Sequence, residues 1–244
     1  MNKYLSILQL NIRRSLGRLL AVLAVFAAGE LGWFARRLSA NPQMSLYAAG
    51  RTFGICFVIC MALSAVALGW RSTKGSVPEY SLGLLAVSGK ASCIISLLYD
   101  LAAMLLAWAA QIMTLYAAIR IYMSSAGYTG GPQGAIVEMY SVPALTVILP
   151  LEQSKYWYMG ALCAACLALA AARMEQVRTR GGFPVLSLLT ILAAGFSMYA
   201  RVEEPFYYNF NGGLLSFACF LALLSIAFGL ASSRKGRKEE DDGE

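Results

Sequence analysis

The 244-residue sequence contains no histidine, the commonest general base and metal ligand at neutral pH. Charged residues are scarce at 14%, against about 25% in soluble domains. No Gly-x-x-x-x-Gly-Lys-Ser/Thr phosphate loop occurs, so the chain lacks that device for binding and hydrolysing ATP. We therefore expect no catalytic residues, no metal ligands and no cofactor bound by this chain, which we predict is not an enzyme.

The six cysteines lie in or at the edge of apolar runs, where cysteine is typically a small buried hydrophobe. Cys163 and Cys166 have the spacing of a redox motif, but no strand–helix pattern surrounds them. We therefore interpret the cysteines as packing residues. The full set is Cys56, Cys60, Cys93, Cys163, Cys166 and Cys219.

Apolar residues, in contrast, make up 59% of the chain, and the mean hydropathy is +0.61. A helix needs about 20 apolar residues to cross a bilayer, and isolated strands cannot satisfy their backbone groups in lipid. The sequence therefore predicts an all-α integral membrane protein with the lipid bilayer around it. No cleavable signal is expected, since the first apolar run has the length of a span. Six spans are expected, at about 19–35, 52–70, 92–122, 156–172, 183–200 and 213–231.

The distribution of Lys and Arg predicts that both termini are cytoplasmic. With that orientation, 14 of these residues lie in cytoplasmic segments and 6 in outer segments, as the positive-inside rule requires. The net charge of +7 is thus explained by topology, and no nucleic-acid partner is expected. The predicted location is the bacterial plasma membrane, as a multi-pass protein.

Three segments outside the spans complete a single transmembrane domain over residues 1–232. Residues 2–16 carry Leu5, Leu8, Ile12 and Leu16 on one helical face beside basic residues, which predicts an amphipathic helix on the inner membrane surface, bent away from the first span at Gly17. The alternative is that this stretch is the cytoplasmic start of the first span. The apolar but proline-broken segment 124–154 is either re-entrant or lies as helices at the outer surface, and the outer surface is favoured. The charged tail 233–244 is expected to be disordered.

Polar residues within the expected spans are candidates for a pathway or for contacts between helices. Glu30 lies in the outer part of the first span, Asp100 about two turns into the third, and Gln111 near its middle. An acidic group inside a membrane is costly, so each acid is a functional candidate. The favoured explanations are contact with headgroup water at the outer interface for Glu30, and pairing between helices or contact with a cytoplasmic vestibule for Asp100. The small residues of "GALCAACLALAAA", from Gly160 to Ala172, allow close helix approach either within the chain or between subunits.

The loop between the second and third spans contains a short segment with the features of a surface helix, at about 77–89. Pro78 suits the first turn of a helix, and Glu79 suits its positive end. The apolar positions that follow would form a docking face on the cytoplasmic side. The candidate contact residues are Pro78, Glu79, Tyr80, Leu82, Leu84, Leu85, Val87 and Ser88.

The stretch "EYSLGLLAVSGKASCIISLLYDL" resembles the coupling-helix region of ABC transporter permeases of the exporter-like class. In such permeases the loop reads aromatic, Ser or Thr, Leu, spacer, Leu-Leu, Pro, aliphatic, Ser and a basic residue. Two positions depart from this pattern: Ala86 replaces the proline, and Gly89 displaces the basic residue by one position. The residues that fit are Tyr80, Ser81, Leu82, Leu84, Leu85, Val87, Ser88 and Lys90. The order of the segments along nearly the whole chain is similar as well.

The resemblance implies a permease subunit that forms an export path for a peptide, lipid or drug-like substrate together with a second permease chain, the same or different. A separate ABC ATPase subunit, carrying ATP and Mg²⁺, would dock on the coupling helix. Two alternatives stay open: a standalone immunity or sensor protein that binds an antimicrobial peptide, and an ion-coupled carrier that uses Asp100 as its coupling carboxylate.

Overall fold

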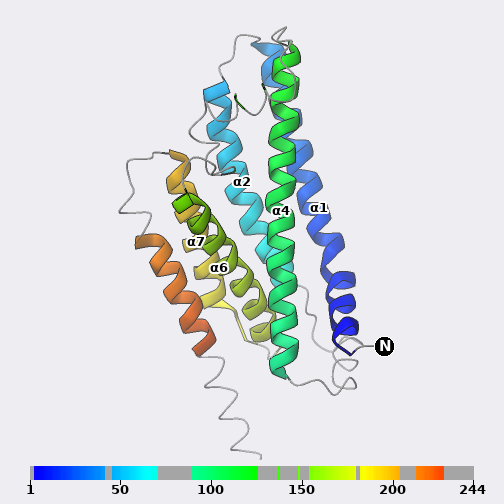
Figure 1. Cartoon of the computed structure of the whole chain (residues 1–244), viewed down its shortest axis with the longest axis vertical. Helices are drawn as coiled ribbons and strands as arrows, with labels where there is room; N and C mark the ends of the chain where they lie inside the picture. The colour runs from blue at the N-terminus through cyan, green and yellow to red at the C-terminus, as the bar shows by residue number, and fades with distance from the viewer. Residues whose placement is uncertain are drawn as a thin grey trace, which may run out of the picture.

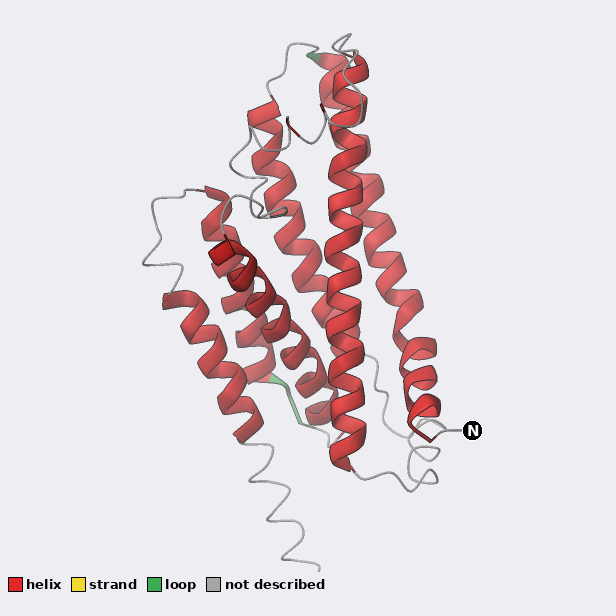
Figure 2. Cartoon of the chain, in the orientation of Figure 1, coloured by secondary structure: helices red, strands yellow, loops and turns green. Residues whose placement is uncertain are grey.

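The computed structural model describes residues 3–41, 46–70, 89–125, 134, 137, 148, 154–179, 182–203 and 213–227. These ranges form helices and short connections, and they contain no strand, as Figure 2 shows. The prediction of an all-helical protein is confirmed. The helices are α1 (Lys3–Ala40), α2 (Leu46–Gly69), α4 (Gly89–Ser125), α6 (Ser154–Thr179), α7 (Val185–Glu203) and a last helix at Gly213–Ala227.

The helices form one bundle in which successive members alternate in direction (Figure 1). As a result, α1 and α4 run parallel to each other although α2 stands between them in sequence. α1 packs against α2 and α4, and α6 packs against α2, α4 and α7. α2 also packs against α4 and α7, so α2 lies at the centre of the bundle.

Four of these helices are long and apolar enough to cross a membrane: Tyr4–Ala40 within α1, Ala49–Gly69 within α2, Ala91–Ser125 within α4 and Trp157–Arg178 within α6. Val185–Ala200 of α7 and the Gly213–Ala227 helix are apolar but shorter. Large apolar side chains point outward on these helices, among them Leu192, Phe220 and Leu223. An apolar outer surface is what a bundle of helices presents to lipid.

The first helix differs from the sequence-based expectation of a separate surface helix over residues 2–16. α1 continues without a break through Gly17, which costs a helix only about 1 kcal/mol relative to alanine. The face that carries Leu5 and Leu8 is exposed, whereas Ile7 and Leu19 are buried against the bundle. Polar contacts from α1 to α4, described below, hold this end of the helix against the bundle.

The other helices agree with the expected spans and extend several of them. α4 covers 92–122 with three residues more at each end, and α6 continues to Thr179, seven residues past its expected end. α7 begins after Pro184 rather than at Phe183 because residues 182–184 are not helical. Residues 77–88 of the expected coupling helix, the tail 233–244 and nearly all of 124–154 lie outside the described residues.

Glycines mark three places where neighbouring helices approach closely. A β-carbon on Gly54 of α2 would lie 2.6 Å from a methyl group of Val202 in α7, and one on Gly69 would lie 2.6 Å from the sulfur of Met174 in α6. A β-carbon on Gly160 of α6 would clash with the ring of Trp108 in α4. The glycines therefore allow contacts that any larger residue would push apart.

The small residues of α6 pack inside this chain. Gly160, Ala164, Ala168 and Ala172 are buried, whereas Ala161 is exposed. The buried four repeat every four residues and so form one stripe on α6. The structure therefore assigns the small-residue face of this helix to packing within the subunit.

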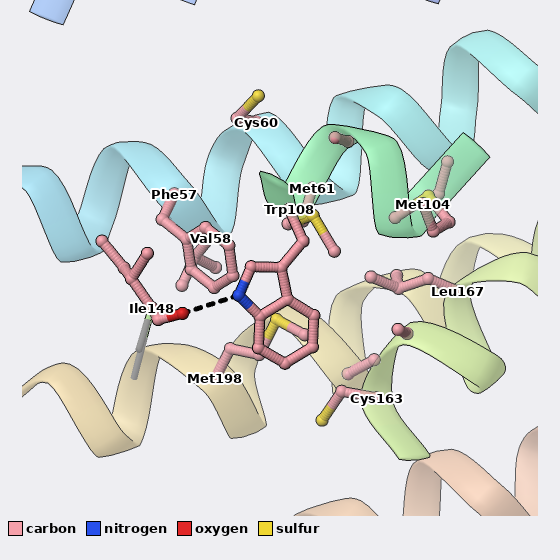
Figure 3. Close-up of a cluster of buried hydrophobic side chains, with 14 of the residues drawn as sticks. Phe57, Val58, Cys60, Met61, Met104, Trp108, Ile148, Cys163, Leu167 and Met198 are labelled. Atoms are coloured by element: carbon pink, nitrogen blue, oxygen red, sulfur yellow. Dashed lines mark hydrogen bonds between the residues drawn. The ribbon is translucent and has the colours of Figure 1, made fainter. Parts of the chain in front are cut away.

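Trp108 is at the centre of the buried cluster shown in Figure 3. Its ring lies 6.0 Å from Phe57 and stacks at 6.1 Å on Trp157, and its indole Nε1 donates a 2.6 Å hydrogen bond to the carbonyl oxygen of Ile148. Ile148 is fully buried. It belongs to the segment 124–154 expected at the outer surface, and at this residue the backbone packs inside the bundle, where its carbonyl oxygen bonds to the Trp108 side chain.

Candidate functional site

Buried polar residues line the contact between α1 and α4. On α1, Asn11, Ser15 and Glu30 share a buried stripe with Ile7, Leu19, Leu23, Phe34 and Leu38, at spacings of four residues and, between Leu23 and Glu30, of seven. Such spacing places side chains on one face of a helix. We call the hydrogen-bonded members of this contact the polar seam. They are Asn11, Ser15 and Glu30 of α1, and Ser96, Tyr99 and Gln111 of α4.

The first half of the polar seam is a chain of hydrogen bonds. Asn11 donates from Nδ2 to the Ser96 hydroxyl at 3.2 Å, and the hydroxyls of Ser15 and Tyr99 are 2.7 Å apart. Ser15 also donates to the carbonyl oxygen of Asn11 at 2.8 Å, within α1. Buried polar groups cost free energy unless they are hydrogen-bonded, so these bonds fix the register of α1 on α4.

The second half is a contact between a carboxylate and an amide. With the Gln111 amide in the orientation that its neighbours favour, Nε2 donates to the two Glu30 carboxylate oxygens at 3.1 and 3.2 Å. Only 5% of Glu30 and 2% of Gln111 is exposed. Cys60 of α2 lies within reach of the same amide, so three helices meet at this point. The contact joins α1 to α4 and lies beside Cys60 and Ser64 of α2.

Asp100 is completely buried, but it lies apart from the carboxylate–amide contact. It follows Tyr99 and precedes Gln111 by 11 residues, which is about 16 Å along a helix. The structure therefore brings together Glu30 and Gln111, two of the three candidates from the sequence, and leaves Asp100 beside the first half of the polar seam.

A second group of polar contacts surrounds Trp70, directly after the end of α2. Arg18 of α1 donates from Nη1 to the Trp70 carbonyl oxygen at 2.8 Å, and Arg178 of α6 lies over the Trp70 ring at 3.9 Å from its centre. A cation near the last carbonyls of a helix, and a guanidinium over an indole, are both favourable. We call these three residues the Trp70 cluster.

The start of α4 is tied to α6 as well. Gln176 donates from Nε2 to the Cys93 sulfur at 2.8 Å, and it accepts a hydrogen bond from Arg173 on the same helix. Trp70 directly precedes residues 71–88, and Cys93 follows them in the first turns of α4. The last turns of α6 therefore hold both flanks of the loop that the sequence analysis singled out.

The candidate contact residues of the coupling helix, from Pro78 to Ser88, lie outside the described residues. Within the described ranges, no group of three or more His, Cys, Asp or Glu side chains could hold a metal ion. Sequence reasoning missed the Trp70 cluster and the first half of the polar seam. A usable signal for the buried face of α1 was the four-residue repeat of Ile7, Asn11, Ser15 and Leu19. A search for apolar residues alone misses this repeat because two of its members are polar.

Comparison with protein-family models, with curated proteins and with solved structures finds no match to this chain.

Proposed function

We propose that the chain is the permease subunit of an ABC transporter of the exporter-like class. Six helices would span the bacterial plasma membrane with both termini in the cytoplasm, and a second permease chain would complete the export path. A separate ATPase subunit, with ATP and Mg²⁺, would supply the energy. The substrate would be a peptide, a lipid or a drug-like compound.

The observation that carries this proposal is the attachment of both flanks of residues 71–88 to the bundle. A coupling element must pass a displacement from its partner to the transmembrane helices. A displacement of this loop would reach α1 and α6 through Arg18 and Arg178 at Trp70, and would reach α6 again through Gln176 at Cys93. Contiguous packed contacts of this kind carry coupling between distant sites.

The alternation of the helices gives further support. In Figure 1 the last described helix runs back toward the end of the bundle where α1 begins. Four helices have the length and apolarity for crossing, and the two shorter ones are packed into the same array. An even number of crossings would leave both termini and residues 71–88 on one side, where the Lys and Arg bias of the sequence favours the cytoplasm.

The test is purification of the tagged chain from its host in mild detergent, with mass spectrometry of the proteins that accompany it. We expect a stoichiometric ATPase that carries a phosphate loop. Leu84→Asp and Leu85→Asp should abolish its association while insertion into the membrane persists, since an apolar-to-charged change at a buried contact costs several kcal/mol.

The matched control for this test is Val137→Asp. Val137 is an exposed apolar residue in the segment after α4 and lies far in sequence from the loop, so the partner should be retained. An unaltered chain that purifies alone in several detergents, or loop variants that retain the ATPase and still support ATP-dependent transport, would contradict the proposal.

The complete burial of Asp100 favours an ion-coupled carrier as the second candidate, since buried acids in membrane helices often serve in ion pathways. A carrier would transport its substrate without ATP. Its transport would depend on pH and would be abolished by Asp100→Asn. Transport that requires ATP and survives this substitution excludes the carrier.

A further inference from the structure

The Trp70 cluster has an excess of positive charge. Arg18 and Arg178 come from different helices and contact the same residue, one at its backbone and one at its ring. Among the described residues, neither guanidinium is paired with a carboxylate. One nitrogen of Arg178, Nη1, is buried without a hydrogen-bond partner, while the side chain as a whole stays partly exposed and Arg18 is exposed.

The cluster lies at the depth where the apolar part of the bundle ends. Trp70 directly follows the apolar stretch Ala49–Gly69 of α2, Arg178 is the last residue of the apolar stretch in α6, and Arg18 precedes the apolar run that begins at Leu19. Tryptophan and arginine at this depth are typical of the membrane–water boundary. The two charges therefore lie at the level of lipid headgroups.

An apolar stripe runs away from the cluster into the membrane level. Ile59 and Leu63 lie on the same face of α2 as Trp70, because eleven residues make about three helical turns. Both are 44% exposed, and Trp70 is 49% exposed. A basic group above an open apolar stripe matches the shape of a phospholipid, whose charged phosphate stands above its acyl chains.

We propose that the Trp70 cluster binds the phosphate of an anionic phospholipid. Arg18 and the exposed part of Arg178 contact the phosphate oxygens, and an acyl chain lies along Ile59 and Leu63. Arginine suits this role because its planar group donates two parallel hydrogen bonds to a phosphate. The inference rests on the membrane location in the proposed function and is independent of any ATPase partner.

The bound lipid would link three helices next to the loop 71–88. Its phosphate would join Arg18 of α1 to Arg178 of α6, and both residues already hold the end of α2. The lipid would therefore be bound by the same cluster that holds the residue before the loop.

Native mass spectrometry of the purified full-length chain tests the proposal, with phosphatidylglycerol and phosphatidylcholine added in parallel. We expect preferential retention of phosphatidylglycerol. The double variant Arg18→Gln/Arg178→Gln should weaken its binding roughly 30-fold, since each basic residue near the membrane surface contributes about fivefold to the attraction of anionic lipid. Arg36→Gln, which removes an exposed arginine from the other end of α1, is the control and should leave binding unchanged.

Two further measurements keep the test decisive. The pair Arg18→Lys/Arg178→Lys keeps the charge and loses the planar fork, so its affinity should lie between those of the unaltered chain and the glutamine pair. This pair replaces the glutamine pair if that variant does not fold. Inorganic phosphate is added in a competition arm and should not displace the lipid, because it lacks the acyl chains.

The proposal is overturned by equal retention of the two lipids, by unchanged phosphatidylglycerol binding in both double variants, or by displacement with inorganic phosphate. None of these results bears on the ATPase, which is detected in the separate copurification experiment. Carbonate extraction of membranes shows whether the chain is inserted at all, so a failure of the shared membrane premise is recognised independently.

Discussion

Removal of one partner from the Glu30–Gln111 contact should destabilise the bundle far more than removal of both. Gln111→Leu takes away the amide that faces both carboxylate oxygens at 3.1 and 3.2 Å. The Glu30 carboxylate then stays 95% buried without that donor. Breaking a buried polar pair of this kind costs about 3–5 kcal/mol, so we expect a loss of about 3 kcal/mol in the free energy of unfolding.

The companion variants separate the hydrogen bond from the charge. Glu30→Gln keeps an acceptor for the Gln111 amide and should change stability by less than about 1 kcal/mol. The double variant Glu30→Leu/Gln111→Leu removes both polar groups and should cost less than Gln111→Leu alone, within about 1 kcal/mol of the unaltered protein. The two sites should therefore be strongly non-additive in a double-mutant cycle.

Reversible unfolding of the purified chain in mixed micelles, followed by far-UV circular dichroism, measures these differences. Thr114→Leu is a suitable control, since Thr114 is a buried polar residue of α4 that bonds only within its own helix, to the Ala110 carbonyl oxygen at 3.0 Å. Additive effects of the two leucine substitutions, or a loss from Gln111→Leu no larger than the loss from Thr114→Leu, would refute the reasoning.

Two further predictions test the packing of α6. Gly160→Ala places a methyl group against the immobilised Trp108 ring and should lower the free energy of unfolding by about 1–3 kcal/mol in the same assay. Adding Trp108→Phe to this variant should recover part of the loss. If the two losses simply add, the contact is contradicted. The sulfur atoms of Cys166 and Cys219 are 3.6 Å apart. A variant whose other four cysteines are replaced by alanine should therefore form an internal disulfide with copper phenanthroline. The disulfide is seen as a gel shift that reductant reverses. If this cross-link does not form, the packing of the Gly213–Ala227 helix against α6 is contradicted.

The membrane class and the helical spans follow from the sequence because each depends on local composition. A run such as Ala49–Gly69 is long enough and apolar enough for a bilayer, and helix is the structure that satisfies its backbone there. Composition gives no direction around a helix. A helix that is apolar on nearly all sides does not reveal which face meets its neighbours, so the buried face of α1, which carries Ile7, Asn11 and Ser15, was not predicted from the sequence.

The contacts of single residues were decided only by the tertiary structure. The sequence offered Glu30, Asp100 and Gln111 as candidates without showing which of them meet, and the parallel packing of α1 on α4 brought together Glu30 and Gln111. The sequence also left two uses open for the small residues of α6, and burial against α2, α4 and α7 assigned them to the interior.

By itself, then, the sequence determined an all-helical chain with long apolar helices, scarce charge and no histidine, since these are properties of composition and of runs along the chain. The tertiary structure decided the polar seam, the Trp70 cluster and the buried place of Ile148. Each of these depends on residues far apart in sequence, such as Arg18 with Trp70 and Trp108 with Ile148. Helical spacing relates residues within one helix, whereas the rotation and register of two helices are set by the side chains that fill the space between them.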